Sequence, residues 1–396
     1  MMIPQGDRDD LIRYYFNQGN TWKEICGFLL FSHNIVVSLH QMKRITKRLK
    51  LKRYRNSSPL PEILRALVDS YQRGYSNAGY KTLWRVINST TDVRVSQETV
   101  RLLIGILDPE GVQLRSRNRL RRRAYVNRGP NYLIHIDGYD KLKPYGICIH
   151  GGIDGFSRRL LWLEASYSNN DPRIVARYYL DFVRRSGRCP RLVRGDGGTE
   201  NVLIRDMQVA FRFNHGDSMS ATKSYLSGRS TGNQRIERFW VNLRSSFASF
   251  WRNLFRDLSD MGKLDIGDPV HVECLRFCFL PLIQKDLDMF LNIWNQHRIR
   301  SQRNGEIPSG IPNVLYYQPA MVYSIDYSFP LPCDLETLDR IRDMYTIPKP
   351  TIGCSDEFVQ LMEELTGIER TNIPQPQTVE SAVNLFTMIT EILSTY

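Results

Sequence analysis

The stretch from residue 131 to residue 196 most constrains the fold, because strand-like and helix-like segments alternate within it. The strand-like segments are 132–136, 145–155 (interrupted by glycines), 159–163 and 191–195. Between the last two of these, apolar side chains recur at helical spacing through 172–186. Three strands, a helix and a further strand predict a mixed sheet that is covered by helices, which is an α/β architecture.

Two of the strand-like segments end on an aspartate. Asp137 closes the first, in HIDGYDKL, and Asp196 closes the last, in RLVRGDGGTEN; a helix predicted at about 233–255 carries Glu237 in its first turn. Three carboxylates that converge repel one another unless a cation lies among them, and such hard oxygen donors suit Mg²⁺ or Mn²⁺. Spacing alone leaves open whether each acid is instead a turn residue or a helix cap.

The charge of the chain favours a polyanionic partner. Its formal net charge is +13, and the excess of positive charge precedes residue 330, since acids outnumber bases beyond it. A basic balance of this size points to nucleic acid first. There is no apolar run of 18 residues, no signal-peptide pattern and no paired arrangement of the seven cysteines. We therefore expect no membrane association and a location in the nucleus if the source is eukaryotic, otherwise in the cytoplasm.

The N-terminal part is predicted to be helical. Residues 1–56 resemble a helix-turn-helix unit, with capping boxes that begin at Thr21 and Ser38. The third helix, at about 39–49, presents the basic residues that we predict to contact DNA, which are Lys43, Arg44, Lys47 and Arg48. A solvated three-helix bundle is the alternative. A second helical unit is predicted at 60–110.

An Arg-rich linker is predicted at 111–130, where no apolar period continues. Arg121, Arg122 and Arg123 are expected to lie along DNA phosphates. A nuclear-import signal is an equally simple use for these three arginines, and a merely solvated linker is the remaining alternative.

Four stretches together resemble a known family. HIDGYDKL, GGIDGFSRRLLWL, VRGDGGTEN and GNQRIERFW are similar to the core of the retroviral-integrase and DDE-transposase superfamily, in particular to integrase core domain proteins of transposon origin. The resemblance covers about 131–260 and implies an RNase H-like core, a mixed sheet flanked by helices. Asp137, Asp196 and Glu237 fall on the family's catalytic acids. It further implies two Mg²⁺ or Mn²⁺ ions held by these acids, double-stranded DNA as the partner, and a homo-oligomer.

The resemblance also has departures. The zinc-binding His/His/Cys/Cys domain of retroviral integrases is not seen, and Gly197 and Asn201 replace the Asn and Phe of the family's D-N-G-x-E-F segment. Gln234 stands where Gly is common in the helix motif. Asp154 falls on a recurrent position that is not a metal ligand, and we expect it to bond to the turn at Ser157.

Further DNA contacts are predicted around the core. Residues 215–231 are rich in Ser, Gly and basic residues and are typical of the mobile loop that borders such active sites. Within and after this loop, the predicted phosphate contacts are Lys223, Arg229, Arg235 and Arg238. The aromatic residues of 239–255 recur at helical spacing and are expected to be core.

The C-terminal part is expected to follow the core as a mainly helical region. Residues 261–320 are predicted to form a helical extension that packs on the core. Residues 321–396 are predicted to be an acidic tail, which is either an interaction surface or a clamp on the core.

The function that the family resemblance implies is metal-dependent DNA nicking and strand transfer. The alternatives are a transposon-derived DNA-binding protein with an idle core and, less favoured, a ribonuclease of the same fold.

Overall fold

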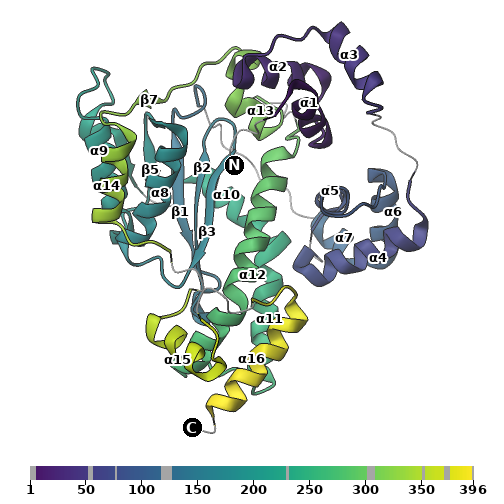
Figure 1. The fold of residues 1–396 in the computed structure, drawn as a ribbon, viewed down its shortest axis with the longest axis vertical. Coiled ribbons are helices and arrows are strands. Elements are labelled where there is room, and N and C mark those ends of the chain that lie inside the picture. Colours follow the sequence, from purple (N-terminus) through teal and green to yellow (C-terminus); the bar gives the residue numbers. More distant parts are fainter. Residues whose placement is uncertain are drawn as a thin grey trace. The chain divides into compact units, whose positions relative to one another are not determined.

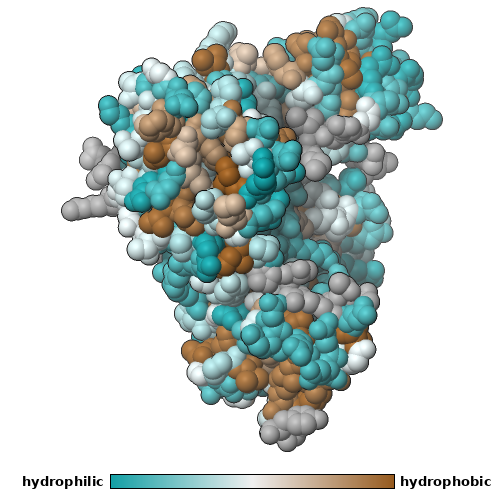
Figure 2. Space-filling model, turned by 60° about the vertical axis from the view of Figure 1, so that its left-hand side comes forward, coloured by the Kyte–Doolittle hydropathy of each residue, from teal (hydrophilic) through white to brown (hydrophobic). Residues whose placement is uncertain are grey.

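The structure is a computed structural model that describes residues 6–51, 57–75, 78–116, 127–228, 232–300, 308–349, 353–369 and 375–394. The chain divides into two compact units. The first contains Met1–Leu133, Asp154–Arg159 and Asn292–Ser328; the second contains Ile134–Ile153, Leu160–Leu291 and Phe329–Tyr396. Among the described residues, no helix has the length and apolarity needed to cross a membrane. Figure 2 shows hydrophobic residues in small areas between hydrophilic ones on the face that it presents.

A five-stranded sheet forms the centre of the second unit (Figure 1). Its order is β3-β2-β1-β5-β6. The strands are β1 (Ile134–Tyr139), β2 (Cys148–Asp154), β3 (Leu160–Ser166), β5 (Val193–Gly195) and β6 (Tyr225–Ser227). β5 is parallel to both β1 and β6, while β2 and β3 are antiparallel. The mixed sheet predicted from the sequence is confirmed.

The second strand is a single strand, but its register against β3 shifts between Gly152 and Ile153, which is where the sequence predicted a break at glycines. Gly152 lies opposite Trp162 of β3, and a Cβ at this position would collide with the indole ring. Glycine therefore makes room for a large side chain that is 2% exposed. This explains why the pattern looked broken while the strand is continuous.

One sequence prediction is wrong in part. The segment 215–231 was expected to be a loop, but its described residues include a 3₁₀ turn (Ala221–Ser224) and β6, which adds an edge strand to the sheet. A strand of three residues, of which only Tyr225 is buried, leaves too little alternation in the sequence to be recognised.

Helices flank this sheet. Figure 1 shows α8 (Pro172–Ser186) and α9 (Val202–Phe211) to one side of it and α10 (Gln234–Leu243) to the other. α8 has the bounds expected from the sequence, because Asp171 caps its first turn and Gly187, at φ 64°, ends it. The helix expected at 233–255 is α10, a π-helical turn (Arg244–Ala248) and α11 (Ser249–Asp260).

Aromatic side chains of α10 and α11 are buried, as predicted. Phe239, Trp251 and Phe255 are at most 1% exposed. Trp251 and Phe255 contact Phe279 of the long helix α12 (Pro269–Gln296) edge-on. α12 lies in the helical extension expected at 261–320, and α16 (Val379–Leu393) packs against it through the pair Phe279 and Phe386.

The acidic tail contributes three helices and a strand to the second unit. β7 (Phe329–Pro330) pairs with β4 (Arg188–Cys189), and α14 (Leu335–Tyr345) packs on α8. α15 (Asp356–Thr366) meets α12 through Phe358 and Phe277. The tail is thus attached to the core by packing and, as shown below, by ion pairs.

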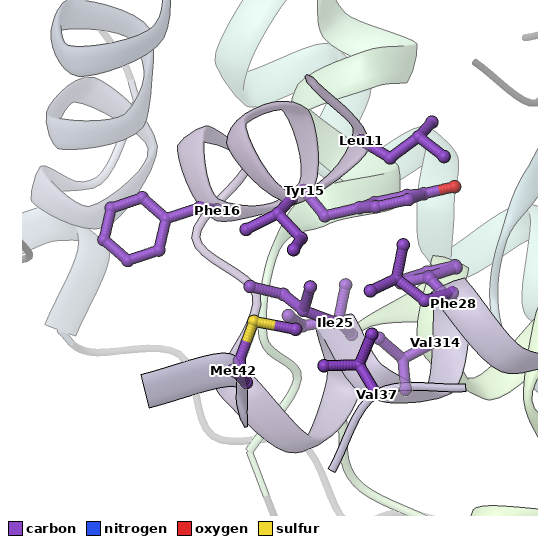
Figure 3. Packing of buried hydrophobic residues seen from close by; sticks show 11 residues of the cluster. Leu11, Tyr15, Phe16, Ile25, Phe28, Val37, Met42 and Val314 are labelled. Carbon is purple, nitrogen blue, oxygen red and sulfur yellow. The ribbon is translucent and has the colours of Figure 1, made fainter. Parts of the chain in front are cut away.

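The first unit is mostly helical. α1 (Arg8–Asn17), α2 (Trp22–His33), α3 (Leu39–Arg48) and α13 (Pro312–Tyr317) bury one hydrophobic cluster. Figure 3 shows Tyr15, Ile25, Met42 and Val314 pointing into it. Both predicted capping boxes are present, at the starts of α2 and α3.

A second group of helices follows in the same unit. It contains α4 (Leu60–Ser70), a π-helical turn (Tyr71–Tyr75), α5 (Tyr80–Thr90), α6 (Gln97–Leu107) and α7 (Pro109–Ser116). Gly74 has φ 93°, which kinks the chain after α4. The predicted linker 111–130 begins inside α7, and 117–126 lies outside the described residues.

Candidate active site

Asp137 lies at the C-terminal half of β1 and is partly buried. The indole Nε1 of Trp240, on α10, donates a hydrogen bond to Asp137 Oδ2 at 2.8 Å. Burial raises the pKa of Asp137 to about 7, and the charges of Glu237 and Asp196 add to this rise while the bond from Trp240 opposes it. The Asp137 carboxylate is therefore held in a position where water solvates it poorly.

Asp196 follows β5 at the same edge of the sheet. Ile134 and Val193 are register partners in the parallel pair β1 and β5, so the two strands end side by side. Two donors act on Asp196 Oδ1: the backbone N–H of Gly198 at 3.2 Å and the side-chain amide of Asn201 at 2.9 Å. Asp196 does not cap α9, since the N-cap position is Asn201 and it makes no side-chain cap bond.

Glu237 is brought to this edge by α10. The helix is attached to β1 through Asn233, whose Nδ2 donates to Ile136 O at 2.7 Å and whose Oδ1 lies 2.7 Å from His135 Nδ1. Glu237 is exposed, four residues further on. Its pKa is raised by partial burial and by the charge of Asp196.

The three acids thus share one electrostatic environment. Asp137 is affected by both of the others, and Glu237 by Asp196. Carboxylates that raise one another's pKa are the donor type that a divalent cation stabilises. In this structure, however, no three His, Cys, Asp or Glu side chains of the described residues lie at metal-binding distance. The donor chemistry fits a divalent cation, and the acids are neighbours without being assembled as a ligand set.

Further acidic and basic groups surround Asp196. Burial raises the pKa of Glu200, and the charges of Asp196 and Asp140 raise it further. Lys143 pairs with Asp140 at 3.2 Å. Glu200 and Asp140 were not among the predicted site residues, although both belong to this acidic neighbourhood.

Four other side chains in or near the site were not predicted from the sequence to take part in it. Trp240 was expected to be core, yet its indole N–H bonds Asp137. Asn201 was noted as a departure from the family pattern, and Asn233 only as the first residue of a motif. His150 is buried in β2 and feels the charge of Asp196. For Asn201 the sequence did offer a signal: it replaces the Phe of the family pattern, and a side-chain amide at such a position needs a hydrogen-bond partner.

The structure places the predicted DNA contacts of α3 on two flanks of the helix. Lys43, Arg44, Lys47 and Arg48 are all exposed. Lys43 Nζ lies 5.5 Å from the centre of the Trp22 ring. Arg44 and Arg48 instead line a cavity of about 330 Å³ with Arg8, Val36, Val37, Gln41 and Ile45. Asp9 forms ion pairs with Arg8 and Arg48.

The remaining predicted contacts are in different parts of the chain. Lys223 and Arg238 are exposed, and Arg235 is partly buried near His135, whose pKa its charge lowers. Arg121, Arg122, Arg123 and Arg229 lie outside the described residues. Asp154 accepts from Asn131 N and from the backbone and hydroxyl of Ser157, which confirms the structural role predicted for it.

The strand order, the acids that follow two adjacent parallel strands, and a third acid on the helix beside them define an RNase H-like core of the integrase type. Residues 124–322, about half of the chain, match the family described as Integrase core domain, so the chain belongs to this family. No curated protein matches it. The membership predicted from the sequence is confirmed. At family level the function is polynucleotidyl transferase-like, with divalent metals and DNA as the family's usual requirements.

Proposed function

We propose that this protein is a metal-dependent polynucleotidyl transferase that nicks a DNA end with water and then joins the new 3′-hydroxyl to a target DNA. The observation that carries the proposal is that Asp137 and Asp196 follow two adjacent parallel strands, while Asn233 attaches the helix of Glu237 to the first of them. Burial raises the pKa of Asp137 and of Glu237, and the charge of Asp196 adds to both rises.

Each acid has a defined part in this proposal. Asp137 and Asp196 would together hold two divalent cations, and Glu237 would complete the set. Bound cations supply an activated water or hydroxyl and stabilise the leaving oxygen in an in-line displacement. Trp240 orients Asp137, while Gly198 and Asn201 orient Asp196. No nucleophilic side chain is needed.

DNA binding is supported by charge and by the first unit. Arg8, Arg44 and Arg48 line one cavity beside α3, and among the described residues Asp9 pairs with Arg8 and Arg48. Guanidinium forks bind phosphate oxygens in pairs. We infer that this cavity receives a backbone phosphate while Lys43 and Lys47 on the other flank reach the duplex.

The catalytic proposal is tested with labelled duplex ends and Mn²⁺. Wild type is expected to nick the DNA, Asp196→Asn to be inactive, and Asp206→Asn, an exposed aspartate of α9, to nick as wild type. Equal nicking by wild type and Asp196→Asn would overturn the assignment.

A DNA-binding protein with an idle core is the second candidate. The observation that favours it is the failure of the three acids to form a ligand set in the described structure. It predicts tight duplex binding with no nicking by wild type or by either variant, in Mn²⁺ and in Mg²⁺.

We also infer a homo-oligomer, and a nuclear location if the source is eukaryotic, otherwise cytoplasmic. The support for self-association is family membership, and that for location is the Arg-rich stretch and the DNA partner. Light scattering of the eluting full-length chain, with and without duplex DNA, measures the first; microscopy of the tagged chain shows the second.

A further inference from the structure

Three polar side chains in the part of the sheet next to Asp196 are buried. Trp162 lies on β3, His150 on β2 and Asn201 in the turn after β5, and they are 2%, 0% and 3% exposed. The indole Nε1 of Trp162 donates to His150 Nδ1 at 3.1 Å. Polar groups buried to this extent are retained with defined partners, because an unsatisfied one is costly.

The indole determines where the imidazole carries its proton. An indole N–H can only donate, so His150 Nδ1 must be the unprotonated nitrogen. Burial lowers the pKa of His150 to about 3, and the ring is therefore neutral near pH 7. A neutral ring whose Nδ1 accepts has its proton on Nε2, which makes Nε2 a donor.

The donor Nε2 in turn determines the orientation of Asn201. His150 Nε2 and Asn201 Oδ1 are both buried, neither has a hydrogen-bond partner of normal geometry in the described chain, and the interaction with Asn201 raises the pKa of His150. The amide oxygen is thus the group that meets the imidazole N–H. This leaves Asn201 Nδ2 for the acids, where it lies 2.9 Å from Asp196 Oδ1 and 3.1 Å from Glu200 Oε1.

We propose that Trp162, His150 and Asn201 are positioning residues that hold the carboxylate of Asp196 through Oδ1 and leave Oδ2 available to a divalent cation. The inference rests on the proposed function, because it assigns a role toward the cation. The backbone N–H of Gly198 bonds the same oxygen, so two donors fix the rotation of the carboxylate. The second amide hydrogen of Asn201 holds Glu200 beside it.

This arrangement distinguishes the chain from the family pattern. A Phe at position 201 would pack without donating, whereas Asn201 adds one N–H to each of two neighbouring carboxylates. A buried amide is acceptable at this position if its oxygen meets the Nε2–H of His150, and the proposal assigns it that partner. The support for Asp196 therefore comes from two other strands of the sheet.

The test measures the affinity of the full-length protein for Mn²⁺ by electron paramagnetic resonance, alongside the histidine tautomer by ¹H–¹⁵N correlation spectroscopy. The variants are Asn201→Leu, Trp162→Phe and Asp196→Asn. The matched control is Trp251→Phe, which removes the same atoms from a buried tryptophan whose Nε1 makes no described hydrogen bond. Thermal melting in the absence of Mn²⁺ reports whether each variant folds.

Asn201→Leu is expected to weaken Mn²⁺ binding about 10-fold or more, which is the usual effect of losing a residue that orients a ligand. Trp162→Phe should weaken it less and abolish the single Nε2–H tautomer of one histidine. Trp251→Phe should change neither.

Two results would overturn this inference without touching the proposed function. In the first, Asp196→Asn weakens Mn²⁺ binding while Asn201→Leu and Trp162→Phe bind Mn²⁺ as wild type does. In the second, the histidine whose signals change in Trp162→Phe carries its proton on Nδ1 in wild type. If Asp196→Asn binds Mn²⁺ as wild type does, the metal assignment of the proposed function fails, and the inference with it. Should Asn201→Leu not fold, Trp162→Phe and the tautomer decide the question.

Discussion

At the scale of single residues, Asp137 is the group whose chemistry the fold changes most. Its ordinary pKa of 3.8 rises to about 7 because it is buried and because two negative carboxylates lie near it. The hydrogen bond from Trp240 limits this rise without cancelling it. A charged Asp137 is therefore unfavourable in the absence of a cation, and binding of a cation must release the proton below pH 7.

This shift predicts a pH-dependent stability. The folded chain binds the Asp137 proton more tightly than the unfolded chain, so the stability that this group contributes is present below pH 4 and is lost as pH rises through about 7. We expect Asp137→Asn, which resembles the protonated acid, to stabilise the metal-free protein at pH 8 by on the order of 2 to 4 kcal/mol relative to wild type. The measurement is urea unfolding with a chelator present.

The comparison at pH 4 serves as the control, because both proteins are then neutral at this position and should differ little. An equal difference at pH 4 and pH 8 would show that Asp137 is not desolvated as described. In a binding titration, the affinity of wild type for Mn²⁺ should increase as pH rises to about 7, because Asp137 must lose its proton to bind the cation.

At the scale of elements, Asn233 attaches the start of α10 to β1. Asn233 bonds both Ile136 O and His135 Nδ1 of β1, and these bonds set where Glu237 lies. We expect Asn233→Ala to lower the free energy of unfolding by about 1 to 3 kcal/mol, since it leaves buried polar groups of β1 unsatisfied. It should also weaken Mn²⁺ binding, because Glu237 loses its fixed position.

The control for this prediction is Asn242→Ala in the same helix. Asn242 Nδ2 donates to Arg238 O, a local bond one turn away. If both variants reduce stability and Mn²⁺ affinity equally, the attachment of α10 to β1 is not what positions Glu237.

α3 carries the second prediction at this scale. Each phosphate contact that is lost reduces the slope of log affinity against log salt by about 0.9. Arg44→Ala combined with Arg48→Ala should therefore lower duplex affinity and reduce the slope by roughly 2, measured by fluorescence anisotropy between 50 and 200 mM salt. Arg340→Ala, an exposed arginine of α14, should leave the slope unchanged. An unaltered slope in the α3 variant would remove this cavity from the interface.

At the scale of the whole molecule, the acidic tail behaves as part of the second unit. Arg184 pairs with Asp339 at 2.5 Å, Arg177 with Asp343 at 3.1 Å, and Arg342 with Asp181 at 3.3 Å, so α8 and α14 exchange ion pairs in both directions. A clamp on the core and an interaction surface were both considered from the sequence. The structure shows packing and ion pairs between α14 and α8, and a clamping role for the tail stays a prediction.

Charge reversal tests this clamp. Asp339→Arg should lower the free energy of unfolding only slightly at low salt, because exposed ion pairs are individually weak. Combining it with Arg184→Asp should restore most of the loss, and high salt should reduce the difference in both cases. A double variant no more stable than the single one would show that packing, and not charge, attaches α14.

Much of this fold could be predicted because its signals are local. Asp171 and Gly187 mark the ends of α8, the capping boxes at Thr21 and Ser38 mark helix starts, and the acids at 137 and 196 follow β-rich runs. Each signal is made by residues within a few positions of one another, so periodicity and capping chemistry suffice to find it.

What the sequence by itself determined is the class of the core, the strands that end on acids and the helices that begin at their caps, since these depend on short-range chemistry. Only the tertiary structure decided that β6 joins the sheet, that Trp240 bonds Asp137, that Trp162 bonds His150, and that α14 packs on α8. These contacts join residues that are from 12 to more than a hundred positions apart. No local pattern encodes such partners, because they are selected by which surfaces remain to be buried once the sheet has formed.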